Sequence, residues 1–147
     1  MAKVDVSVSS DMTPEQAWAL ASDLNRFDEW LTIFGGWRSS VPATIERGTR
    51  VSSCVKVKGF RNTIHWEVTQ YEPPSCIELR GCGRGGIRIA LTLTISGGAR
   101  GSTFHLVAEL CGGVLSGPVG AVVARVLRSD IRKSVENLSR LQATAHR

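Results

Sequence analysis

Histidine and cysteine are the residue types that most often hold a transition metal, and their spacing here matches no metal site. The histidines form no His-x-Glu or His-Glu-x-x-His pattern; they are His65, His105 and His146. The cysteines form no Cys-x-x-Cys pair; they are Cys54, Cys76, Cys82 and Cys111. We therefore expect no metal, no cofactor and four free thiols.

The segment from Gly81 to Gly86 matches the Gly-x-Gly-x-x-Gly fingerprint of dinucleotide sites. Such a site needs a helix directly after the glycines, because the pyrophosphate sits on a helix N-terminus. Residues 87–91 instead alternate as a strand does. We interpret the segment as a hairpin loop. It is either a plain turn or a flexible lip of a cavity, with Arg84 able to meet an anionic group of a ligand.

Cleavage of a phosphodiester needs a base, an acid and a cation around one phosphate. The outward positions of the predicted strands offer such groups in His65, Glu67, Arg80, Arg88 and His105. If the strands pair in chain order, the two histidines lie three strands apart, which is roughly 14 Å at about 4.8 Å per strand. That separation is too large for one scissile bond, so a solvated sheet face is the better interpretation.

Aromatic residues concentrate between Trp18 and Trp37. Trp18 and Phe27 suit packing of two short helices against a sheet, and Trp30 favours the core as well. Phe34 and Trp37 lie in a glycine-containing stretch, where the alternatives are ordinary core packing and a lid over an apolar ligand.

Polar candidates for a ligand contact are few. Arg61 and Asn62 follow a hairpin at Gly59 and are candidates for the rim of a cavity, with a solvated hairpin tip as the alternative. Trp66 has an inward position in a central strand, where it could line a cavity or fill it. Its indole N–H needs a partner when buried.

The last helix carries a basic strip made of Arg125, Arg128, Arg132 and Lys133. No aromatic residues interleave with the strip, so the stacking platform of a nucleic-acid site is missing. We expect a solvated helix face and no nucleic-acid partner.

Hydrophobic periodicity predicts the elements that position these residues. Valines at 4, 6 and 8 indicate a first strand. The run Thr13-Pro14-Glu15-Gln16 predicts a capped helix that ends near Ser22, and Asn25 is expected to cap a second helix ending near Leu31. Residues 32–40 are expected to be irregular.

From residue 43 onward, apolar residues recur at every second position, as they do in strands. Strands are expected at 43–46, 49–58, 62–71, 76–82, 87–96 and 102–111. Their connections are too short for crossovers, so neighbouring strands should pair antiparallel. A helical stripe from Val119 to Leu141 follows, in a helix that begins at Gly117-Pro118 and ends near Ala143.

Alternation along the strands turns an almost wholly apolar face inward. This face and the stripe of the last helix should enclose an apolar cavity. The predicted lining is Trp30, Phe34, Trp37, Val55, Val57, Ile64, Trp66, Leu79, Ile89, Leu91, Phe104, Leu106, Val119, Val122, Val123 and Val126.

The composition agrees with a single domain that has an apolar interior. A chain of 147 residues, 42% of them hydrophobic, suits one domain over residues 1–147 with a substantial core. No apolar run reaches the roughly 20 residues of a membrane helix. Lys and Arg total 18 against 13 Asp and Glu, and this net charge of +5 permits an anionic partner without establishing one. We expect a cytoplasmic monomer or homodimer.

The order of one strand, two helices, six strands and a long helix resembles the α+β helix-grip fold of the SRPBCC (START/Bet v 1-like) superfamily, which includes polyketide cyclase/dehydrase proteins. Residues 30–39, 55–59 and 117–132 resemble an actinobacterial subgroup, some of whose members are labelled toxins of type II toxin–antitoxin systems. The resemblance implies a seven-stranded antiparallel curved sheet wrapped around a long C-terminal helix.

Two functional hypotheses follow from the resemblance and the apolar inner face. The first is binding of a small hydrophobic, polyketide- or lipid-like molecule, with cyclisation or dehydration as the reaction class if the protein is an enzyme. The only polar candidates near the cavity are Ser53, Arg61 and Arg84, so no catalytic group is assigned. The second is a toxin component, with an antitoxin protein as its partner, that acts through a protein or nucleic-acid contact on its basic surface.

Overall fold

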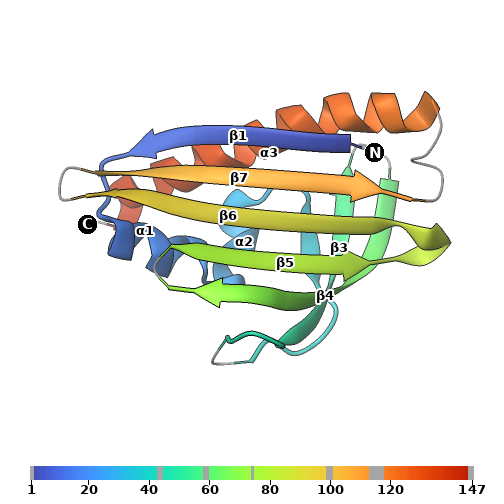
Figure 1. Cartoon of the computed structure of the whole chain (residues 1–147), viewed down its shortest axis with the longest axis horizontal. Helices are drawn as coiled ribbons and strands as arrows, with labels where there is room; N and C mark the ends of the chain where they lie inside the picture. Colours follow the sequence, from blue (N-terminus) through green and yellow to red (C-terminus); the bar gives the residue numbers. More distant parts are fainter. Residues whose placement is uncertain are drawn as a thin grey trace.

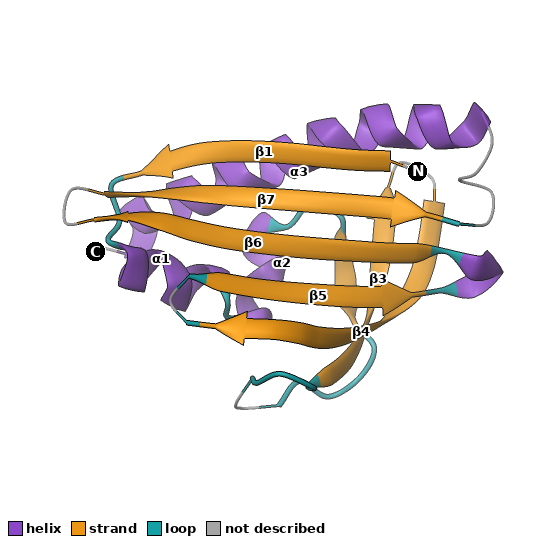
Figure 2. Cartoon of the chain, in the orientation of Figure 1, coloured by secondary structure: helices purple, strands orange, loops and turns teal. Residues whose placement is uncertain are grey.

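The computed structural model describes residues 2–42, 45–57, 60–73, 75–98, 101–112 and 118–145. Its strands are β1 (Ala2–Ser10), β2 (Phe34–Trp37), β3 (Arg50–Val57), β4 (Phe60–Glu72), β5 (Cys76–Cys82), β6 (Arg88–Gly98) and β7 (Gly101–Cys111). Its helices are α1 (Pro14–Ala21), α2 (Phe27–Trp30) and α3 (Pro118–Ala145), with short 3₁₀ turns η1 (Leu24–Arg26) and η2 (Arg84–Gly86). The helices lie on one face of the sheet (Figures 1 and 2).

The seven strands form one sheet in the order β1-β7-β6-β5-β4-β3-β2. All neighbours pair antiparallel, and the first strand pairs with the last. The long helix α3 runs along β1 and packs on β1 and β7 (Figure 1). The predicted helix-grip fold is therefore confirmed, with its seven antiparallel strands and its long C-terminal helix.

The first helix begins and ends close to its predicted bounds because its N-terminus is capped as the sequence indicates. The Thr13 hydroxyl accepts a hydrogen bond from the Gln16 amide at 3.3 Å, and the Gln16 side chain accepts one from the Thr13 amide at 3.1 Å. Pro14 occupies the first turn, where no intrahelical N–H bond is lost.

The predicted start of the second helix is wrong. Asn25 does not cap the helix but lies inside the 3₁₀ turn η1, and α2 begins at Phe27 with no side-chain cap at Arg26. Arg26 instead forms an ion pair with Glu29, with a distance of 2.8 Å between the guanidinium and the carboxylate. The first turn of α2 therefore has an ion pair at its start and no side-chain cap.

The second strand also lies elsewhere than predicted. The expected strand at 43–46 is not formed at Ile45 or Glu46, and residues 43–44 lie outside the described part. The strand β2 instead forms at 34–37 in the stretch expected to be irregular. Gly35 lets β2 approach β3, because a Cβ there would lie 2.9 Å from the Cys54 Sγ atom. Gly36 has φ +109°, a conformation that favours glycine, at a register shift in the pairing.

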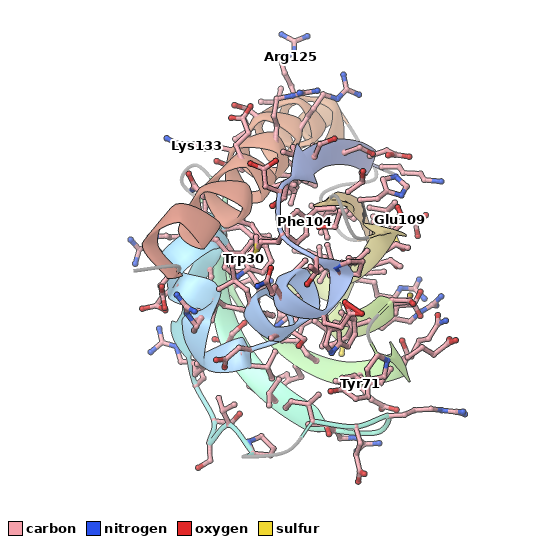
Figure 3. The ribbon with its side chains drawn as sticks, turned by 90° about the vertical axis from the view of Figure 1, so that its left-hand side faces the viewer. Trp30, Tyr71, Phe104, Glu109, Arg125 and Lys133 are labelled. Carbon is pink, nitrogen blue, oxygen red and sulfur yellow. The ribbon has the colours of Figure 1, made fainter. Side chains whose placement is uncertain are left out.

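The core lies between the helices and the inner face of the sheet, where Trp30 and Phe104 are buried (Figure 3). On α3 the buried positions are Leu127, Ile131, Ser134, Val135 and Leu138. Their spacing fixes the phase of the helix. Val122 lies roughly 140° around the helix from Leu127 at 100° per residue, and its side chain is 64% exposed. The prediction that Val122 lines the cavity is therefore wrong.

Alternation places the predicted apolar positions of β4 to β7 inward, and all of them are buried apart from the half-buried Ile87, which precedes β6. The bulkiest of them, Trp66, faces Gly81 on the neighbouring strand β5. A Cβ at Gly81 would lie 2.4 Å from Ile64 Cγ2 and 2.8 Å from Trp66 Cε3. The missing side chain at Gly81 therefore makes the space in which the indole ring lies.

Substitution Gly81→Ala is expected to destabilise the protein by about 1–3 kcal/mol, because the new methyl group overlaps Ile64 and Trp66 in a packed layer. Ser96→Ala, at an exposed position of β6, is the control and should change stability by less than about 0.5 kcal/mol. Urea denaturation followed by far-UV circular dichroism measures both. Equal stability of the two variants would contradict the packing described for Trp66.

Candidate functional site

An apolar cavity lies between the segment that includes α2 and β2 and the inner face of β3 to β6. Its volume is about 20 Å³, which is room for about one water molecule. Ser53 is the only polar side chain among its described lining residues. The lining is Phe27, Leu31, Ile33, Phe34, Trp37, Val51, Ser53, Val55, Trp66, Leu79 and Leu91.

The structure brings part of the predicted lining together at this cavity. The predicted residues found there are Phe34, Trp37, Val55, Trp66, Leu79 and Leu91. Ser53, expected near the cavity as a polar candidate, also lines it, and the lining residues that were not predicted are Phe27, Leu31, Ile33 and Val51. Ser53 and Val51 lie two and four positions before Val55, so the alternation of a strand places all three on the same inward face. Leu31 and Ile33 flank Thr32 in a short segment. Which of its side chains face the sheet is decided by tertiary packing and cannot be deduced from the sequence pattern.

Other predicted lining residues lie elsewhere. Buried in the core but outside this cavity are Trp30, Ile64, Ile89, Phe104 and Leu106. Val126 is half-buried and packs against the core. The side chains of Val57, Val119 and Val123 lie outside the described part of the structure.

The predicted rim residues separate. Asn62 pairs with Val55, so it has the inward parity of a lining residue and is half-buried. Arg61 pairs with Lys56 and is exposed with it on the outer face, so the structure does not place Arg61 at the cavity. The alternation of the strand is the reason. Arg84 lies in η2, a turn directly followed by β6, which confirms a hairpin loop; its side chain lies outside the description.

The mouth of the cavity lies beside β2. Three lining residues, Phe34, Trp37 and Val55, are only half-buried, whereas Phe27 behind them is buried. The rings of Phe34 and Trp37 are in contact at a centroid distance of 5.0 Å and are tilted by 60° to each other. The Trp37 indole N–H donates to the Leu24 carbonyl at 3.0 Å, which holds the ring in place. Trp37 is thus both an anchored packing residue and a wall of the mouth.

Ser53 and Trp66 form the polar feature of the cavity. The Trp66 indole N–H donates to the Ser53 hydroxyl oxygen at 2.9 Å, and Ser53 is 3% exposed. This bond satisfies the buried indole N–H, which would otherwise cost free energy. It also fixes the indole across the inner face, from β3 at Ser53 to β5 at Gly81.

Hydrogen bonds tie residues 27–37, which we call the lid segment, to α3. Ser134, fully buried on α3, accepts a bond from the Thr32 amide at 2.9 Å and donates to the Asp130 carbonyl at 2.7 Å. The Thr32 hydroxyl lies 3.1 Å from the Asp130 carbonyl. Because Thr32 lies between Leu31 and Ile33, these bonds position two lining residues of the cavity.

The outer face carries charged groups that satisfy one another. Glu78 accepts hydrogen bonds from Thr69 at 2.7 Å, from Arg80 at 3.1 Å and from Thr92 at 3.3 Å. The bond from Thr69, followed by those from Arg80 and Thr92, lowers the pKa of the Glu78 carboxyl below its ordinary value, against a smaller opposing effect of burial. Glu78 therefore stays ionised and is poorly suited to be a general acid.

The two outward histidines are separate, as predicted. His65 on β4 lies 2.8 Å from the Ser52 hydroxyl, and the His105 ring on β7 is in hydrogen-bonding contact with the Asp5 carboxylate. Strands β5 and β6 lie between β4 and β7, so the histidines cannot act on one bond. Among the described residues no group of three or more His, Cys, Asp or Glu side chains could hold a metal ion, and the four cysteines are free thiols. No described helix is long and apolar enough to cross a membrane.

Comparison with known proteins gives relatives over nearly the whole chain. Residues 1–142 match the model of the family described as polyketide cyclase / dehydrase and lipid transport. The chain is 44% identical over 137 residues to the protein named Toxin Rv0910 of Mycobacterium tuberculosis, covering 93% of this chain and 95% of that protein.

Solved structures with low sequence identity share the fold. A protein of Thermus thermophilus, TTHA0849, superposes with a TM-score of 0.80 at 16% identity, over 97% of this chain and 98% of that one. A START superfamily protein of Mycobacterium smegmatis gives a TM-score of 0.75 at 12% identity, over 95% of each chain.

Substitution Ser134→Ala is expected to lower the free energy of unfolding by about 1–3 kcal/mol, because it leaves the Thr32 amide without its acceptor. Amide exchange at Thr32 should accelerate in the same variant. The control is Ser129→Ala, which removes a hydroxyl from an exposed position of the same helix. If both variants exchange Thr32 at the rate of the unchanged protein, the bonds to Ser134 do not hold the lid segment.

Proposed function

The chain belongs to the polyketide cyclase / dehydrase and lipid transport family, and from that premise we propose that it binds a small apolar molecule in the cavity beneath α2 and β2. The observation that carries the proposal is the lining, in which ten of the eleven described residues are apolar. Such a surface gains free energy by excluding water, at about 25 cal/mol per Å² of apolar area.

The cavity is small, so binding requires lining side chains to move. Among the half-buried lining residues, Phe34 and Val55 can shift toward solvent at least cost, because they are not enclosed on all sides, whereas the hydrogen bond to Leu24 holds Trp37. An incoming ring would occupy the space between them and Trp66. The ligand thus completes the apolar packing of the mouth.

Binding rather than catalysis is the activity we propose. Cyclisation or dehydration needs an acid or a base beside the reacting atoms. The described lining contains no ionisable side chain, and its single hydroxyl accepts a bond from Trp66. These features support a carrier or sensor of a hydrophobic molecule.

The test uses the neutral fluorescent probe N-phenyl-1-naphthylamine, whose emission rises in an apolar site. We expect saturable binding to the unchanged protein and a Kd at least roughly tenfold higher for Val55→Phe, whose ring fills the mouth, a loss of about 1.4 kcal/mol. Lys56→Phe adds the same ring at the next position of β3, on the exposed outer face, and should bind as the unchanged protein does.

Two results would overturn this proposal. One is the absence of saturable binding of any neutral apolar probe to the folded protein. The other is an equal loss of affinity in Val55→Phe and Lys56→Phe, which would mean that the probe binds away from the cavity.

Trp66→Ala should enlarge the cavity and shift the preference toward bulkier ligands.

A second candidate function is supported by the name of the 44% identical relative. We propose, as this alternative, a toxin that contacts an antitoxin protein through the exposed basic residues of α3. Arg125 and Lys133 project from α3 away from the sheet (Figure 3).

Growth inhibition on expression in a bacterial host tests this alternative. With the antitoxin protein co-expressed, it predicts that Arg125→Glu combined with Arg132→Glu still inhibits growth, because the contact that relieves inhibition is lost, while Val55→Phe is relieved as the unchanged protein is. His65→Ala with His105→Ala should have no effect, since the two side chains cannot act together. If growth inhibition is instead lost in Val55→Phe, it depends on the cavity, and that result supports ligand binding.

A further inference from the structure

The hydroxyl of Ser53 has a proton that the protein leaves available. A serine hydroxyl has one proton to donate and two lone pairs that accept. The Trp66 indole N–H takes one lone pair at 2.9 Å. Within the described residues no acceptor receives the Ser53 proton, although Ser53 is 97% buried, at 3% exposure, and lines the cavity.

Resting on the proposed function, we infer that the cavity selects neutral apolar molecules that carry a carbonyl oxygen, which accepts a hydrogen bond from the Ser53 hydroxyl. The Trp66 N–H donates to the same oxygen, and this polarises the hydroxyl and makes it a stronger donor. A pure hydrocarbon would leave the buried proton without an acceptor, at a cost in free energy.

The charge of the ligand is also determined by the lining. No cationic side chain is present among the described lining residues, so a carboxylate would be buried without a counter-ion. No side chain among them could take the Ser53 proton either, so the hydroxyl donates a hydrogen bond and does not act as a nucleophile. A ketone or ester is therefore favoured over a fatty acid.

Three ligands of nearly equal size separate these possibilities: acetophenone, ethylbenzene and benzoate. Binding is followed by the indole N–H signals of the four tryptophans in ¹H–¹⁵N spectra, with Trp66 assigned from Trp66→Phe. We expect acetophenone to bind the unchanged protein roughly fivefold more tightly than ethylbenzene, the ratio expected for one hydrogen bond. Benzoate should bind most weakly.

Two variants isolate the hydroxyl. Trp66→Phe retains the Ser53 proton and should keep the preference for acetophenone. Adding Ser53→Ala to Trp66→Phe removes the donor without freeing an indole N–H, and the preference should disappear. Ser52→Ala, which removes a hydroxyl from the outer face of the same strand, is the control and should leave the preference unchanged.

The outcomes are distinguishable. If acetophenone and ethylbenzene bind equally, or if the double variant keeps the preference, this inference is wrong and the proposed function stands. If neither binds, the proposed function fails and this inference fails with it. Should the double variant not fold, the infrared carbonyl stretch of bound acetophenone decides: a lower frequency than in an alkane supports the hydrogen bond, and an alkane-like frequency overturns it.

Discussion

The inner face of the sheet is almost wholly apolar along β3 to β7, and covering that face is the constraint on which the rest of the molecule depends. The helix α3 presents only a stripe, from Leu127 to Leu138, and covers the side formed by β1 and β7. The short helix α1 packs on β6 and β7. The side formed by β3 to β6 is left to the segment between Phe27 and Trp37, whose side chains cover it incompletely. The cavity lies where this cover is thinnest.

The position of Trp66 explains why an apolar cavity contains a polar pair. An indole is too large for a crowded inner face unless a neighbouring position is empty, and Gly81 provides that space. Its N–H then needs an acceptor, and Ser53 on the next strand supplies one. The hydroxyl in the cavity is thus a consequence of placing a tryptophan at the centre of the sheet. The proton of this hydroxyl, which no described residue accepts, results from the same arrangement.

The sequence predicted the strands and their inward faces well because alternation has a period of two and is independent of tertiary contacts. It failed for β2, since two glycines carry no strand propensity and pair only because β3 lies beside them. It failed for Val122 because the spacing of the valines at 119, 122, 123 and 126 predicts one apolar helix face, whereas the buried positions from Leu127 onward show that the buried face is rotated away from it. The alternation of β3 to β6 predicted the lining residues on those strands, whereas Leu31 and Ile33 were missed because their contacts depend on long-range packing.

Family membership explains the fold, and the lining residues must explain the function. The fold persists at 16% identity, so most side chains, including those of the cavity, are free to differ between proteins of this shape. In this chain the two ends of the lid segment are held differently. Thr32 is bonded to a buried serine of α3, whereas Phe34 and Trp37 remain half-buried, with one indole hydrogen bond to Leu24. Among its described lining residues the cavity is therefore least enclosed along β2, where the half-buried aromatic rings would meet an apolar ligand first.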